Sequence, residues 1–182
     1  MKGIVFTMFI EMVEEQFSID TAEEMIEGCD LPSGGAYTSV GTYDHREMVT
    51  LVVQLSKITD QPVPDLLRAY GHFLFGKFAQ LFPVFFDGIT SSLTFAGRIE
   101  DVIHVEVLKL YPDAQLPRFE TVSKTPDELK LIYRSDRHLG DLAEGLLQSC
   151  IVYFGEERSV SLTRENLEEP TGAVCFTMTR LP

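Results

Sequence analysis

The sequence predicts an α+β fold, in which a helical N-terminal part packs against a C-terminal part with a four-stranded antiparallel sheet. Apolar residues recur every three or four positions up to about residue 111, which is the periodicity of helices. From residue 118 segments appear in which they alternate, which is the periodicity of strands. Helices and strands are therefore segregated along the chain, which favours α+β over alternating βαβ units.

Four helices are predicted in the first 82 residues. In the first of them apolar side chains face one side and glutamates the other, which is typical of a helix packed on a core. A loop rich in Gly, Ser and Thr separates the second helix from the third, and Pro64 suits the first turn of the fourth. The helices are expected at about residues 1–18, between Ser18 or Asp20 and Gly28, at 45–58 and at 64–82.

The rest of the chain is predicted to form two more helices and four strands. A fifth helix is expected over residues 93–111, because Pro112 cannot continue it. The turn Thr125-Pro126-Asp127 lies between two alternating segments and favours a hairpin. The strands are expected at about residues 118–124, 128–135, 159–163 and 173–179, and the last helix at 139–154.

The composition excludes several classes of protein. The chain of 182 residues has 28 Asp and Glu against 15 Lys and Arg, a net charge of −13, which argues against binding to nucleic acids or anionic membrane surfaces. No apolar run reaches the roughly 18 residues of a membrane span, and glutamates interrupt the N-terminal segment, so no secretory signal is predicted. Three cysteines without CxxC spacing disfavour a disulfide scaffold or a zinc site. We therefore expect a cytoplasmic protein.

Aromatic residues gather on and just after the fourth predicted helix. Aromatic side chains at helical spacing usually belong to a core, but this group is larger than a pair of helices normally needs. Such a group would also suit a flat apolar ligand. Its members are Tyr70, Phe73, Phe75, Phe78, Phe82, Phe85 and Phe86.

His104 lies in an apolar run of the fifth predicted helix. Taken alone, it is either a buried neutral histidine bonded to the backbone or an axial ligand of a metal. Zinc would require four ligands, and no other His or Cys lies close in the sequence. The second interpretation therefore points to a metal whose other ligands come with a cofactor, as in haem.

Tyr133, Ser135 and Arg137 form a second candidate site at the end of the second predicted strand. Residues i, i+2 and i+4 of a strand share a face, so these side chains are expected to point the same way. A guanidinium binds a carboxylate with two hydrogen bonds, and hydroxyls add further donors. The group is therefore either a solvated strand end or a clamp for carboxylates such as the two propionates of a haem.

The chain resembles the H-NOX family of haem nitric oxide/oxygen-binding domains, also called HNOB, which is related to the sensor domain of soluble guanylate cyclase. The resemblance covers essentially the whole chain. It rests on the N-terminal MKG, the segment DVIHVEV around His104, Leu116-Pro117, and the Tyr-x-Ser-x-Arg motif of Tyr133, Ser135 and Arg137. It implies one domain over residues 1–182, with a helical subdomain at 1–60, a second subdomain at 61–182, and haem b buried between them.

The resemblance also implies roles for individual residues. His104 is expected to be the proximal ligand of the haem iron, and Pro117 to press on the haem and bend it. Tyr133, Ser135 and Arg137 are expected to hold the propionates. The distal wall is expected to consist of Val5, Phe9, Leu74, Phe78, Leu142 and Leu146.

The chain departs from the oxygen-binding members of the family, which carry a distal tyrosine. Leu142 occupies the matching position here, with Phe9 and Leu74 in the supporting places. Bound dioxygen draws electron density from iron, and a hydrogen bond to such a charged partner contributes about 1.5–3 kcal/mol, or roughly tenfold to a hundredfold in affinity. Nitric oxide and carbon monoxide need no such donor. The sequence therefore predicts binding of nitric oxide and carbon monoxide with discrimination against dioxygen.

By this resemblance the chain senses a gas and is not an enzyme. Nitric oxide would weaken or break the bond between iron and His104, and the signal would pass to a separate histidine kinase or cyclic-di-GMP enzyme. Two alternatives remain open at this point. One is a haem enzyme such as a peroxidase, which needs a polar acid or base on the distal side. The other is a cofactor-free module that binds an apolar molecule, in which His104 is structural.

Overall fold

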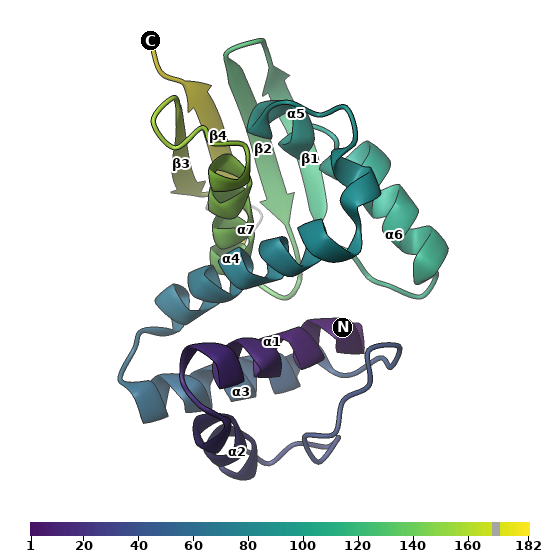
Figure 1. The fold of residues 1–182 in the computed structure, drawn as a ribbon, viewed down its shortest axis with the longest axis vertical. Helices are drawn as coiled ribbons and strands as arrows, with labels where there is room; N and C mark the ends of the chain where they lie inside the picture. The colour runs from purple at the N-terminus through teal and green to yellow at the C-terminus, as the bar shows by residue number, and fades with distance from the viewer. Residues whose placement is uncertain (169–171) are drawn as a thin grey trace.

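The computed structural model describes residues 1–168 and 172–182, and it confirms the α+β fold (Figure 1). Within these residues a helical part comes first and an antiparallel sheet follows. The elements are α1 (Gly3–Gln16), α2 (Ile19–Glu27), α3 (His45–Thr59), α4 (Val63–Leu81), the 3₁₀ turn η1 (Pro83–Phe86), α5 (Ser92–Ala96), the π-helix η2 (Ile99–Ile103), α6 (His104–Leu110), β1 (Arg118–Lys124), β2 (Glu128–Arg134), α7 (Gly140–Tyr153), β3 (Val160–Asn166) and β4 (Val174–Arg180).

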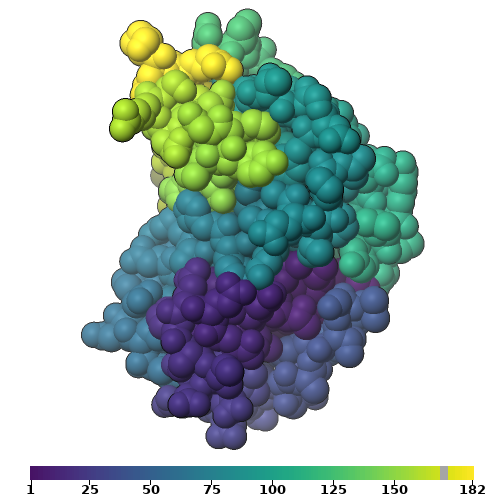
Figure 2. Space-filling model, viewed as in Figure 1, coloured from purple at the N-terminus to yellow at the C-terminus, as the bar shows by residue number. Residues whose placement is uncertain are grey.

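The helices α1, α2 and α3 form a layer beneath α4, and the sheet lies on the other side of α4 (Figure 1). Ser18 begins α2 by accepting a hydrogen bond from the backbone N–H of Thr21 at 3.0 Å, and Asp44 does the same for α3. Phe6, Phe9 and other fully buried apolar side chains fill the space between these helices. In the space-filling view the N-terminal helices and the sheet-bearing part of the chain meet along one boundary on the face shown (Figure 2).

The four strands form one antiparallel sheet in the order β1-β2-β4-β3. Strand β2 is buried on one face only, where Leu129, Leu131 and Tyr133 alternate with half-buried residues. This face packs on α5 and α7. The alternation of apolar residues in the sequence therefore predicts the buried face of β2 correctly. The sheet also places the end of this strand close to α7.

The helices α4 and α7 approach each other so closely that their backbones touch. A Cβ atom on Gly145 would lie 2.2 Å from the carbonyl oxygen of Arg68, and one on Gly71 would lie 2.5 Å from that of Leu142. No other residue type fits at either position without displacement of the backbone. The two glycines therefore fix how far α7 stands from α4.

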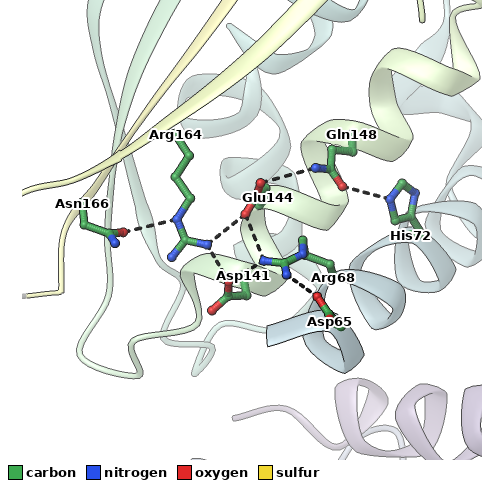
Figure 3. A network of polar contacts seen from close by, with 8 residues as sticks. All are labelled: Asp65, Arg68, His72, Asp141, Glu144, Gln148, Arg164 and Asn166. Carbon is green, nitrogen blue, oxygen red and sulfur yellow. Dashed lines mark hydrogen bonds and ion pairs between the residues drawn. The ribbon is translucent and has the colours of Figure 1, made fainter. Parts of the chain in front are cut away.

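A polar network on the outside of this helix pair ties it to the sheet (Figure 3). Arg68 of α4 donates to Asp141 of α7 at 2.9 Å, and Arg164 of β3 donates to Glu144 of α7 at 2.9 Å. Arg164 also bonds Asp141, so the two arginines share α7 carboxylates between them. The network further contains Asp65, His72, Gln148 and Asn166.

The expectation of one helix over residues 93–111 is wrong. The chain ends α5 at Gly97, whose N–H bonds the carbonyl of Leu93, and continues as a π-helix before α6 begins. The N–H of Ile103 reaches back five residues to the carbonyl of Arg98, which is the π pattern. Apolar spacing is nearly the same in both arrangements, so periodicity alone does not reveal the break.

No helix within residues 1–168 and 172–182 is long and apolar enough to cross a membrane.

Candidate functional site

A cavity with a volume of about 280 Å³ lies between the N-terminal helices and the sheet-bearing part. Side chains from α1, α4, α6, α7 and the end of β2 form its walls, and most of them are aliphatic or aromatic. This volume approaches the range of roughly 300–1,000 Å³ that is usual for ligand pockets. Five of the seven aromatic residues expected to suit a flat ligand lie on the walls: Phe75, Phe78, Phe82, Phe85 and Phe86.

His104 lies on the cavity wall as the first residue of α6, with 15% of its side chain exposed. Its Nδ1 lies 3.2 Å from the Oε2 atom of Glu100. Burial lowers the pKa of the imidazole, and this effect outweighs the opposing effect of the Glu100 carboxylate. The ring is therefore neutral at pH 7, the form in which a histidine can donate a lone pair to a metal.

Tyr133, Ser135 and Arg137 all lie on the cavity wall, although the strand does not position all three. Strand β2 ends at Arg134, and the chain then turns, with the N–H of His138 bonded to the carbonyl of Ser135. The expected strand end at residue 135 and the strand argument for Arg137 are therefore wrong, because this turn and not the alternation of a strand directs its side chain. The backbone N–H of Arg137 also donates to Ser135 Oγ at 3.2 Å.

The hydroxyl of Tyr133 belongs to the same group. Tyr133 is only 3% exposed, and burial raises the pKa of its phenol, while the neighbouring Ser135 and Arg137 act in the opposite direction. The phenol therefore stays protonated at neutral pH and is available as a donor. The three side chains together offer two hydroxyls and one guanidinium to a cavity whose walls are mostly apolar.

The opposite wall of the cavity is apolar. Five of the six residues expected there line it: Val5, Leu74, Phe78, Leu142 and Leu146. Phe9 differs from the expectation, because it does not line the cavity. It is fully buried in the core, and its ring packs edge-on against Tyr70 with 5.1 Å between ring centres. Periodicity identifies an inward face but does not distinguish a core from a cavity wall.

Tyr70 of α4 has a hydroxyl that is already occupied. The phenol is fully buried and donates its hydrogen bond to the carbonyl oxygen of Val5 at 2.5 Å. Burial raises the pKa of this phenol well above its usual value. Tyr70 therefore fastens α4 to α1 and does not direct its hydroxyl at a ligand.

Pro117 lies on the cavity wall in the segment between α6 and β1. The same segment is tied to the N-terminal part by an ion pair between Lys2 and Asp113, whose Nζ and Oδ1 atoms lie 3.2 Å apart. Lys2 also donates to Thr42 Oγ1 at 2.9 Å and lies 5.5 Å from the ring centre of Tyr111. These contacts connect the start of α1 with the chain that follows α6.

Several wall residues were not predicted from the sequence. The π-helix brings Ile99 and Ile103 to the cavity, and α7 contributes Leu147 and Cys150 beyond the two leucines already named. Glu100 was also missed as the partner of His104. The spacing of four between Glu100 and His104 is a signal that could have found it.

The donor set of the cavity fits a flat cofactor that carries carboxylates. One neutral imidazole lines an apolar cavity whose volume approaches that of usual ligand pockets, and a guanidinium with two hydroxyls lines the same cavity. In the described part of the chain, no group of three or more His, Cys, Asp or Glu residues could hold a metal ion. A metal bound at His104 would take its remaining ligands from the cofactor.

Fold and cavity together define an α+β domain that binds a ligand in its interior. A sequence profile described as HNOB, haem-NO-binding, matches residues 2–162. The chain therefore belongs to the haem-NO-binding (H-NOX) family, whose members bind haem. It is a haem-based gas sensor domain and not an enzyme.

Solved structures of H-NOX proteins share this fold over the whole chain. The Fe(II) unliganded H-NOX protein from K. algicida is 34% identical, with a TM-score of 0.92, over 100% of this chain and 97% of that chain. The H-NOX from Shewanella woodyi in the Fe(II)CO state is 38% identical, with a TM-score of 0.83, over 100% and 95% of the two chains. An H-NOX protein from S. oneidensis in the Fe(II)NO state is 26% identical, with a TM-score of 0.88, over 100% of both chains. A comparison with curated proteins gave no match.

Proposed function

We propose that this chain holds haem b between a subdomain of residues 1–60 and one of residues 61–182, and that it senses nitric oxide. It would also bind carbon monoxide and would discriminate against dioxygen. One observation carries the proposal: a single cavity is lined by His104, by Arg137 with its two neighbouring hydroxyls, and by an apolar wall. The relatives from S. oneidensis and Shewanella woodyi, in the Fe(II)NO and Fe(II)CO states, support it.

The chain's own residues would hold the haem at several points. When bound, haem supplies a ferrous iron that can take up a diatomic gas. His104 would donate a ring nitrogen to the iron, and Pro117 would press against the macrocycle and bend it. Tyr133, Ser135 and Arg137 would bind the propionates.

Gas selectivity would follow from the wall formed by α1, α4 and α7. Leu142 and Leu146 present only carbon to the cavity, and the hydroxyl of Tyr70 is bonded to the backbone of Val5. No hydrogen-bond donor from these side chains would therefore stabilise the charge that dioxygen acquires on iron. The affinities for nitric oxide and carbon monoxide would be reduced little by the absence of a donor.

The signal would begin with release of His104 from the iron. His104 is the first residue of α6, so its release would free this helix to shift relative to the cavity. Such a shift acts as a two-state element, and its extent is limited by the difference in gas affinity between the two states. Output would pass in the cytoplasm to a separate protein, a histidine kinase or a cyclic-di-GMP enzyme. The net charge of −13 would favour a basic surface on that partner.

An absorption spectrum of the purified chain tests the proposal. After supplementation with haem, a strong Soret band is expected, and the reduced protein should change its spectrum on addition of nitric oxide or carbon monoxide. Absence of the band would refute the proposal and would favour a cofactor-free module for apolar molecules.

Replacement of Leu142 by tyrosine tests the basis of gas selectivity. Reduced wild-type protein is expected to form no stable dioxygen complex in air, whereas Leu142→Tyr should gain roughly tenfold to a hundredfold in dioxygen affinity from one hydrogen bond. Leu142→Phe is the matched control, because it adds a similar ring without a hydroxyl. A stable dioxygen spectrum of the wild type, or an equal gain in both variants, would contradict the proposed selectivity.

Loss of the guanidinium at position 137 should weaken the hold on haem. Arg137→Met is expected to accelerate transfer of haem to an excess of apomyoglobin by about tenfold to a hundredfold, since a hydrogen bond to a charged group contributes about 1.5–3 kcal/mol. Arg134→Met is the control, because Arg134 pairs with Glu120 across β1 and β2 and does not line the cavity. Equal rates of haem transfer in the two variants would show that Arg137 does not bind the haem.

A further inference from the structure

We propose that Glu100 is a positioning residue for His104, which holds the imidazole in the tautomer with hydrogen on Nδ1 and leaves Nε2 free for the cavity. The inference rests on the proposed role of His104 as the iron ligand. It adds a residue outside the cavity that sets how strongly this ligand donates.

The direction of the hydrogen bond follows from the second partner of the carboxylate. Glu100 Oε2 lies 3.2 Å from His104 Nδ1 and also 2.9 Å from the backbone nitrogen of Phe119. A backbone N–H can only donate, so Oε2 is an acceptor on that side. The same oxygen then accepts from Nδ1–H, and the lone pair of the neutral ring remains on Nε2.

The position of Glu100 decides which nitrogen is left for a ligand. His104 lines the large cavity, whereas Glu100 lines a separate polar pocket on the other side of Phe119. The carboxylate therefore engages Nδ1 from outside the cavity. Because the other ring nitrogen has no hydrogen-bond partner among the described residues, Nε2 is the atom that can serve the cavity.

The π-helix builds this arrangement. Residues 99–103 form one wide turn, and the backbone N–H of His104 closes it on the carbonyl of Ile99. Phe119, at the start of β1, then holds Glu100 from the sheet side. Glu100 is thus fixed by two elements, while His104 depends on Glu100 for its orientation. Single π turns of this kind are frequent at functional sites.

The consequence for the ligand is electronic as well as geometric. A carboxylate that accepts a hydrogen bond from the other ring N–H makes a metal-bound imidazole more basic and fixes its rotation, and loss of such a partner typically costs about tenfold to a hundredfold in metal affinity or activity. Glu100 would therefore strengthen the bond that nitric oxide must weaken. It would raise the threshold at which α6 is released.

The iron–histidine stretching frequency of the reduced haem protein measures this effect directly. Glu100→Gln keeps the shape of the side chain but removes its charge, so the frequency should shift down, and nitric oxide should release His104 faster. Glu106→Gln is the matched control, since Glu106 lies on α6 and pairs with Lys109 at the surface. An unchanged frequency in Glu100→Gln, or an equal shift in Glu106→Gln, would overturn the proposal.

A second measurement separates this inference from the proposed function. In the full chain purified without haem, ¹⁵N spectra of the histidine rings should show hydrogen on Nδ1 of His104 in the wild type and a shift toward the other tautomer in Glu100→Ala. The same tautomer in both proteins would refute the role of Glu100. Failure of the chain to bind haem would instead refute the proposed function and leave the tautomer result to stand.

Discussion

Replacing His104 by glycine should abolish the iron–histidine vibration of the reduced protein completely, because the chain then has no lone pair to offer from α6. The fold should persist, because the side chain of His104 bonds Glu100 and is not part of the apolar core. Free imidazole added to the variant should restore the spectrum of the reduced wild-type protein by filling the space that the side chain left.

His72→Gly provides the control for this experiment. His72 lies on α4 and bonds Gln148 at 3.1 Å (Figure 3). It does not line the cavity, so its loss should leave the haem spectrum unchanged. An unaltered spectrum in His104→Gly would show that another group binds the iron. Circular dichroism of both variants should match that of the wild type and so exclude unfolding as the cause.

Gly145→Ala should produce the largest loss of stability among single methyl additions in the helix pair. The new Cβ would meet backbone atoms of Arg68, with 2.2 Å to the carbonyl oxygen, and backbone cannot rotate away as a flexible side chain can. Overpacking of this kind costs about 1–3 kcal/mol, and each kcal/mol lowers the Tm of a chain of this size by roughly 2–4 °C. Thermal unfolding followed by circular dichroism measures the change.

Gly76 offers a matched control on α4. A Cβ at this position meets no atom within 4 Å, and the backbone is helical, so Gly76→Ala should raise the stability by about 0.5–1 kcal/mol. Opposite signs in the two variants would establish that the backbones touch at Gly145. Equal Tm values would contradict the close approach of α4 and α7.

The repeating parts of the fold could be predicted from the sequence because burial imposes a period on them. The helices α1, α3, α4 and α7 and all four strands were found in this way, to within a few residues. The break between α5 and α6 was not found, since a π turn changes the backbone hydrogen bonds but hardly changes which residues are apolar. Such local deviations depend on tertiary partners, here on the contact of Glu100 with Phe119.

The cavity was partly predictable for a related reason. Motif and spacing brought attention to His104 and Arg137, and both line the cavity. The argument that a strand directs Arg137 toward the cavity was wrong, because the turn after β2 directs this side chain. Phe9 was expected on the cavity wall but belongs to the core, because periodicity does not separate the two. Glu100 was not identified from the sequence, although its side chain is the partner of His104.

The ion pair between Lys2 and Asp113 should make the response of this sensor depend on ionic strength. The two residues are 111 positions apart, and Asp113 follows α6 closely in the sequence, so the pair links the segment after this helix to the start of α1 and should oppose a displacement of the helix. Asp113 is 62% exposed, and mobile ions screen such a pair. The attraction between Lys2 and Asp113 should therefore be stronger in dilute buffer and weaker at the salt concentration of a cell.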